Sequence, residues 1–142
     1  MEEVLKEKLW TYIVHNNPDF QFKLQENQSV SSYLEEKVSG IGPLINQLLM
    51  DSNPSYVIEE QCLSELTNDL RPSRYIYIRS VLEEDFQTEY TRLLQTGILT
   101  FEINNMVEAC KELLDELEFS EENEDNRHIR YAVIGQIHGY LN

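Results

Sequence analysis

The stretch with the most chemical character is RPSRYIYIR, residues 71–79, which holds three of the chain's eleven basic residues. Arginine and tyrosine are enriched among the side chains that dominate protein interfaces, so Arg71, Arg74 and Tyr77 could form a partner-binding patch. The other reading is an amphipathic helix whose arginines flank a buried stripe. On a helix Arg74 and Arg79 lie about 140° apart and cannot converge on one anion, which favours the second reading. The candidate interaction residues are Arg71, Arg74, Tyr77 and Arg79.

Catalysis or metal binding would need histidine, cysteine or carboxylate groups that converge. His15, His128 and His138 match no metal-ligand spacing. Cys62 and Cys110 lack CxxC spacing and fall in helical patterns, so we expect both to be reduced and buried. The sequence contains no glycine-rich phosphate loop, GxSxG elbow or HExxH motif. It therefore predicts no catalytic, cofactor-binding or metal-binding residue.

Two further side-chain rows have ordinary structural explanations. Four carboxylates on one predicted helix resemble a bundle metal site, but no Glu-x-x-His partner exists, which favours a solvated face. The row consists of Glu108, Glu112, Asp115 and Glu116. Gly135 and Gly139 form a small-residue row in the last helix, which indicates close packing within the bundle or in a homodimer.

The bulk composition predicts one soluble domain, residues 1–142, because a chain of 142 residues can bury a core of its own. Its formal charge is −15, with 12 acids and 7 bases in residues 1–80 and 14 acids and 4 bases in residues 81–142. Such a field opposes nucleic-acid phosphate and anionic lipid, so we expect no direct nucleic-acid or membrane partner. No signal peptide or spanning segment is visible, and we expect a cytoplasmic location.

Apolar residues at helical spacing, punctuated by proline and glycine, predict helices along the whole chain. The expected helical segments are 3–15, 30–39, 43–52, 54–70, 71–95, 101–119 and 127–141. Segment 43–52 is either a separate helix, which we favour, or the continuation of 30–39 past a kink. We expect a polar loop around Phe20 and Phe22 and a solvated loop at residues 120–126. No repeat of fixed period is apparent, and strand-like alternation reaches four residues only at YIYI. The predicted fold is all-α, a single compact domain of six or seven helices.

The segment LRPSRYIYIRSVLEEDF, residues 70–86, resembles the bacterial family catalogued as domain of unknown function 1896. In that family a leucine, then Ser-x-Tyr, then a hydrophobic helix ending in Glu-x-Phe recur, and Ser73, Tyr75 and Phe86 fit this pattern. LWTYIVHNNPDF, residues 9–20, is similar to the family's opening helix and turn. The resemblance implies an all-helical fold, a bacterial cytoplasmic setting and frequent association with mobile elements. It implies no active site.

These observations favour a non-catalytic, cytoplasmic helical protein that acts through protein contacts, with an unknown partner or a second copy in a homodimer. One alternative is an acidic DNA mimic or an accessory protein of a mobile element, which would need ordered carboxylates in rows. Another is an enzyme with an unrecognised site, which would need a deep pocket that gathers histidines or carboxylates with shifted pKa values.

Overall fold

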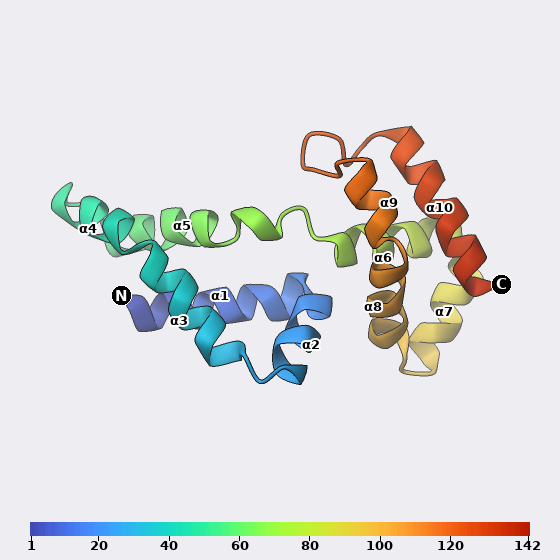
Figure 1. The fold of residues 1–142 in the computed structure, drawn as a ribbon, viewed down its shortest axis with the longest axis horizontal. Helices are drawn as coiled ribbons and strands as arrows, with labels where there is room; N and C mark the ends of the chain where they lie inside the picture. Colours follow the sequence, from blue (N-terminus) through green and yellow to red (C-terminus); the bar gives the residue numbers. More distant parts are fainter. The chain divides into compact units, whose positions relative to one another are not determined.

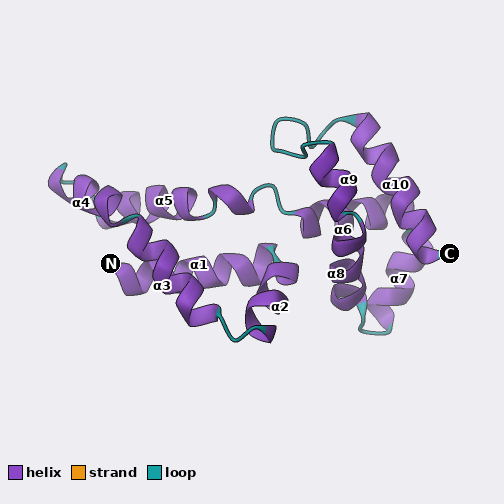
Figure 2. Ribbon diagram, in the orientation of Figure 1, coloured by secondary structure: helices purple, strands orange, loops and turns teal.

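The computed structural model describes all residues from 1 to 142, and every regular element in it is helical (Figures 1 and 2). The first helices are α1 (Glu2–Asn16), α2 (Pro18–Glu26), α3 (Val30–Gly40), α4 (Gly42–Met50), α5 (Ser55–Leu66) and the short 3-10 turn η1 (Asn68–Leu70). They are followed by α6 (Arg74–Asp85), α7 (Gln87–Gln95), α8 (Leu99–Ala109), α9 (Lys111–Glu116) and α10 (Arg127–Leu141). The all-α prediction is confirmed. None of these helices has the continuous apolar length that a membrane span requires.

The ten α-helices exceed the six or seven predicted, for identifiable reasons. The expected loop around Phe20 is helix α2, which begins at Pro18, a residue well suited to the first helical turn. The helix expected over 71–95 breaks at Phe86, and the helix expected over 101–119 breaks at Cys110. Both breaks are one-residue joints that keep the backbone bonded. The Phe86 amide still donates to the Leu82 carbonyl at 2.9 Å, as it would in a continuous helix. The bend therefore needs no glycine or proline, and the sequence carries no mark of it.

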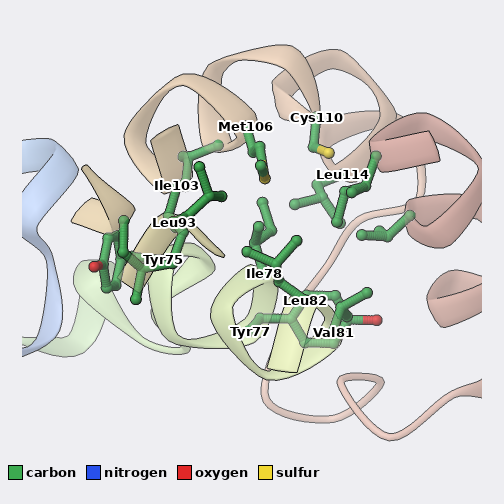
Figure 3. Close-up of a cluster of buried hydrophobic side chains, with 14 of the residues drawn as sticks. Tyr75, Tyr77, Ile78, Val81, Leu82, Leu93, Ile103, Met106, Cys110 and Leu114 are labelled. Atoms are coloured by element: carbon green, nitrogen blue, oxygen red, sulfur yellow. The ribbon is translucent and has the colours of Figure 1, made fainter. Parts of the chain in front are cut away.

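The chain divides into two compact units, Met1–Leu70 and Arg71–Asn142. The first unit buries a core of ten residues, namely Leu5, Leu9, Ile13, Leu24, Val38, Ile45, Leu48, Ile58, Cys62 and Leu66. The second unit has its own core, centred on Ile78, Leu82, Ile103, Met106 and Val133, part of which is drawn in Figure 3. One domain spanning residues 1–142 stays a prediction, because two compact units can still unfold as one cooperative structure.

The two units share the same order of helices and most of their helix–helix contacts, although the third and fifth helices pack together extensively only in the second unit. In each unit the first helix packs against the second, third and fifth, and the fourth packs against the fifth. The joints after the first helices have nearly the same backbone, with φ −134° and ψ 60° at Asn17 and φ −135° and ψ 52° at Phe86. Ser29 and Ile98, which precede the third helices, also agree, with φ −113° for both and ψ of 15° and 13°.

Buried positions correspond as well. Leu24 and Leu93 are buried at the ends of the second helices, and Val38 and Val107 are buried in the third. In the fifth helices three residues at spacing four are buried in each copy, Ile58, Cys62 and Leu66 in α5 and Ile129, Val133 and Ile137 in α10. The structure thus contains a repeat of topology, although no repeat of fixed period is apparent in the sequence. The topology repeats while most residue types differ, which is why no period is visible in the sequence.

The glycine row of the last helix does not bring helices together. An added Cβ at Gly135 or Gly139 would meet no atom within 4 Å. The expectation that these glycines allow close packing within the bundle is therefore wrong. Within the second unit the row faces open space.

The second helix of each unit ends in the same hydrogen-bonded turn. Gln28 in the first unit and Gly97 in the second adopt φ values of 54° and 77°, the left-handed region that favours glycine. The amides of Ser29 and Ile98 then donate to the carbonyls of Leu24 and Leu93, at 2.9 and 3.1 Å. The two units therefore end their second helices with the same left-handed turn, formed by glutamine in one and by glycine in the other.

Replacing Gln28 with glycine should raise the free energy of unfolding by about 1 kcal/mol, because glycine has no Cβ to clash in this conformation. The matched control is Gln25→Gly, inside the same helix, which should lower that free energy by about 1 kcal/mol. Both can be measured by urea unfolding followed through the fluorescence of Trp10, the chain's one tryptophan. A loss of stability in both variants would contradict the prediction.

Candidate functional site

Arg74 begins α6 and is bonded within its own unit. Ser73 caps the helix, its Oγ accepting a hydrogen bond from the Ile76 amide at 3.1 Å. The Arg74 guanidinium lies 2.7 Å from the Asp115 carboxylate, and Lys111 approaches the same carboxylate at 3.0 Å. Hydrogen bonds from Arg74 and then Lys111 lower the pKa of Asp115 below its ordinary value. Arg74 therefore ties α6 to α9.

The other two arginines of RPSRYIYIR have different partners. Arg71 lies 3.8 Å from Glu121, in the loop before α10. Arg79 donates a hydrogen bond to the Tyr90 hydroxyl, on α7, at 3.3 Å. The three guanidinium groups thus contact three separate partners and do not surround one anion. This agrees with the reading in which arginines flank a buried stripe.

Tyr77, the fourth candidate interaction residue, belongs to the core of the second unit. It is 8% exposed, and its ring centroid lies 4.7 Å from that of Phe119 at an interplanar angle of 55°. Burial raises the pKa of the Tyr77 hydroxyl, which has no hydrogen-bond partner. Figure 3 shows Tyr77 on the same helix as the buried residues Ile78 and Leu82. Within this unit, its ring offers little surface to a partner.

No group of three or more histidine, cysteine or acidic side chains is placed to hold a metal ion. Both cysteines are free and buried, as predicted. Burial raises the pKa of Cys110 to about 11 and that of Cys62 above its ordinary value, so neither is a ready nucleophile. His15 lies in the last turn of α1, and its Nδ1 is 2.8 Å from the carbonyl oxygen of Thr11 in the same helix. Its ring is therefore engaged with its own helix.

The second unit exposes large apolar side chains around the turn between α7 and α8. Leu94 is 54% exposed, Ile98 42% and Phe101 61%, and all three lie within eight residues of one another. We call these three residues the α7–α8 corner. Leu93, next to Leu94 in α7, is only 3% exposed, so Leu94 lies outside the buried face of this helix.

The first unit shows that this fold does not require apolar residues there. The matching turn between α2 and α3 places polar residues at the corresponding positions, which are Gln25, Ser29 and Ser32. Because the same backbone forms with polar residues, the apolar character of the α7–α8 corner has no evident role in folding. An exposed apolar cluster without a folding role is typical of a binding surface.

In the acidic segment that includes α9, some carboxylates are paired with basic side chains. Residues 108–125 carry nine acids and one base. Within the segment, Asp115 is paired with Arg74 and Lys111, and Glu121 with Arg71. These pairs interrupt the run of free carboxylates that a mimic of DNA phosphates would present.

The sequence matches no family model, no curated protein and no solved structure. The resemblance to domain of unknown function 1896 stays a prediction, and the residues that carry it have structural roles here. Ser73 caps α6, the Tyr75 hydroxyl lies 3.3 Å from Thr100 Oγ1, and Phe86 is the joint to α7. A helical family could share these residues without sharing an activity.

Proposed function

We propose that the chain is a non-catalytic bacterial cytoplasmic protein that acts by binding another protein at the α7–α8 corner. The observation that supports this most directly is the exposure of Leu94, Ile98 and Phe101 where the other copy of the topology is polar. Phe101 offers a large ring at 61% exposure, and aromatic anchors of this kind supply much of the binding energy at interfaces.

The charge of the chain narrows the class of partner. A formal charge of −15 disfavours nucleic acid and anionic lipid, both of which need clustered basic residues for recognition. The arginines of residues 71–79, the densest basic segment, already contact groups of their own unit: Arg71 contacts Glu121, Arg74 contacts Asp115 and Arg79 contacts Tyr90. A protein surface with its own apolar patch is the remaining macromolecular class that the corner fits.

The test exchanges the corner for the residues that the first unit uses. The variant L94Q/I98S/F101S should keep its helical circular dichroism and melting temperature, because none of the three side chains is buried. In affinity capture from native lysate, the amount of the main captured protein should fall at least about tenfold relative to the parent chain. Truncating a hot-spot residue costs upward of about 2 kcal/mol of binding free energy.

The matched control is Phe22→Thr, which removes a 55% exposed ring from α2 and introduces the residue found at the same place in α7, Thr91. It should retain the captured protein. If the partner is a second copy of this chain, light scattering should show that the parent chain is a dimer and the triple variant a monomer. Equal capture by the parent and both variants would refute the corner as the binding surface.

A further inference from the structure

The seam between the first and fifth helices differs between the two units. In the first unit a groove of about 580 Å³ opens along α1 and α5. Its lining is mixed, with apolar and aromatic groups between polar ones, and consists of Val4, Glu7, Lys8, Thr11, Tyr12, His15, Asn16 and Leu63. Volumes of this size are typical of sites that take a small molecule or one or two side chains.

In the second unit the matching seam is filled by the protein's own side chains. Tyr77 projects from α6 and packs against Phe119, and only 8% of Tyr77 remains exposed. Arg130, on α10, acts electrostatically on Tyr77 and pairs with Glu84 at 2.7 Å and Asp85 at 3.1 Å. Two rings and a guanidinium therefore close this seam.

The first unit has none of these three groups at the matching places. Lys8 corresponds to Tyr77, because each lies nine residues before the joint that follows its helix, Asn17 or Phe86. Lys8 is 46% exposed and reaches Glu59, the counterpart of Arg130, at 3.6 Å.

The counterpart of Phe119 is Asn53. The amides of Phe119 and Asn53 both close the turn after the fourth helix, where they donate to the carbonyls of Leu114 and Leu48 at 3.0 and 3.2 Å. The floor of the first unit's groove, Tyr12 and Leu63, is only partly buried. The groove is thus the place where the second unit buries the rings of Tyr77 and Phe119 and where the first unit has Lys8 and Asn53 instead.

The charge of the first unit indicates what else an occupant would carry. Residues 1–70 contain 12 acids and 4 bases. Three of those bases are held by acids of the same unit: Lys6 by Glu3 and Glu35, Lys8 by Glu59, and Lys37 by Asp69. Glu7 lines the groove directly. A cationic occupant is complementary to this surface, and an anionic one is opposed by it.

We propose that the groove between α1 and α5 binds a basic peptide segment of a partner protein through an aromatic side chain with an arginine or lysine beside it. The ring occupies the position that Tyr77 fills in the second unit, over Tyr12 and Leu63. The cation lies near Glu7, which lines the groove. The site lies in the other unit from the α7–α8 corner, and the proposal stands independently of that corner.

The probe is the capped dipeptide N-acetyl-arginyl-tyrosine amide, titrated into the ¹⁵N-labelled full chain and followed by amide chemical shifts. We expect saturable shifts at Thr11, Tyr12 and Leu63, with a dissociation constant on the order of 1 mM for so small a ligand. The aspartyl-tyrosine analogue should bind about two- to fivefold more weakly, as an exposed charge contact allows. The arginyl-alanine analogue should bind at least about tenfold more weakly than the arginyl-tyrosine probe, because it has no ring to bury.

Two variants at one position test whether the ring is what the groove accepts. Lys8→Tyr places a phenol ring where the second unit has one. Because this ring would fill the groove, the dissociation constant of the arginyl-tyrosine probe should rise at least about tenfold. Lys8→Met removes the charge without adding a ring and should bind within about twofold of the parent chain. The amide spectrum of each variant also reports that it is folded.

Several results would overturn the proposal. These are shifts that do not saturate or that spread over the surface, equal binding of the aspartyl and arginyl peptides, and undiminished binding by the folded Lys8→Tyr variant. Equal loss in Lys8→Met and Lys8→Tyr would show that the lysine itself, and not the open space beside it, binds the probe, and this too would overturn it.

Discussion

Replacing Leu82 with alanine is expected to lower the free energy of unfolding of the second unit by about 3 kcal/mol. Leu82 is 0% exposed and belongs to the core drawn in Figure 3. Truncating a fully buried leucine removes apolar burial and leaves a cavity that the surrounding helices fill only partly, at a cost of about 2–5 kcal/mol.

Cysteine labelling measures this change unit by unit. Cys110 is buried in the second core and Cys62 in the first. A loss of 3 kcal/mol should speed labelling of Cys110 by a thiol reagent by about 100-fold when the opened unit recloses faster than the reagent reacts. The control, Ile76→Ala, truncates a 45% exposed residue of the same helix and should change the rate by less than about fivefold. Equal effects of the two substitutions would contradict the assignment of the core.

The same experiment tests the predicted single domain. If residues 1–142 unfold cooperatively, Leu82→Ala accelerates labelling of Cys62 as much as that of Cys110. If the two units open separately, only Cys110 responds.

Tyr77 should respond in opposite directions to two substitutions. Tyr77→Ala is expected to lower the free energy of unfolding by about 3–5 kcal/mol, because it empties the space beside Phe119. Tyr77→Phe keeps the ring and should raise that free energy by about 1 kcal/mol, because the hydroxyl it removes is buried without a partner. Denaturant unfolding measures both, and a loss of 1 kcal/mol or more in Tyr77→Phe would contradict the assignment.

Alkaline pH gives an independent readout of the same hydroxyl. Burial raises the pKa of Tyr77 in the folded state, so folding favours the protonated phenol. The stability that it contributes is therefore complete below the unfolded pKa of about 10 and declines as the pH rises through the folded pKa. Tyr77→Phe should show a smaller decline over that range than the parent chain does.

The sequence predicted the helices that have clear ends. Helix α10 was expected at residues 127–141 and begins at Arg127, where Asn126 caps it by accepting hydrogen bonds from the amides of His128 and Ile129. Helix α1 was expected at residues 3–15, and Asn17 and Pro18 mark its end. Cap and stop residues act through local hydrogen bonds and backbone angles, so they can be read without knowing the tertiary fold.

The joints at Phe86 and Cys110 could not be predicted in the same way. Both are ordinary apolar residues at non-glycine angles, and apolar spacing continues on each side of them. Helix α2 was missed because its two aromatic residues have different roles. Phe20 packs against the first core, whereas Phe22 is 55% exposed, and together they give a weak helical period.

For the candidate sites, local geometry was readable and long-range packing was not. Helical arithmetic separated Arg74 from Arg79, and the structure gives them partners on different elements. The burial of Tyr77 depends on Phe119, far along the chain, and no local pattern shows that contact. The groove along α1 emerges only when Lys8 is compared with Tyr77, two residues of unrelated type.

The glycines of α10 have one more consequence, for local motion. Each glycine in a helix interior weakens the helix by about 1 kcal/mol relative to alanine, and here neither is needed to admit a neighbour. Beyond Ile137, a hydrogen bond of 2.8 Å from the Tyr140 hydroxyl to Glu102 links this end of α10 to α8. That bond and the packing of Leu141 against the second core hold the final turn in place, but the two glycines lower the cost of opening it, so its amide protons should exchange with solvent well ahead of those near Val133.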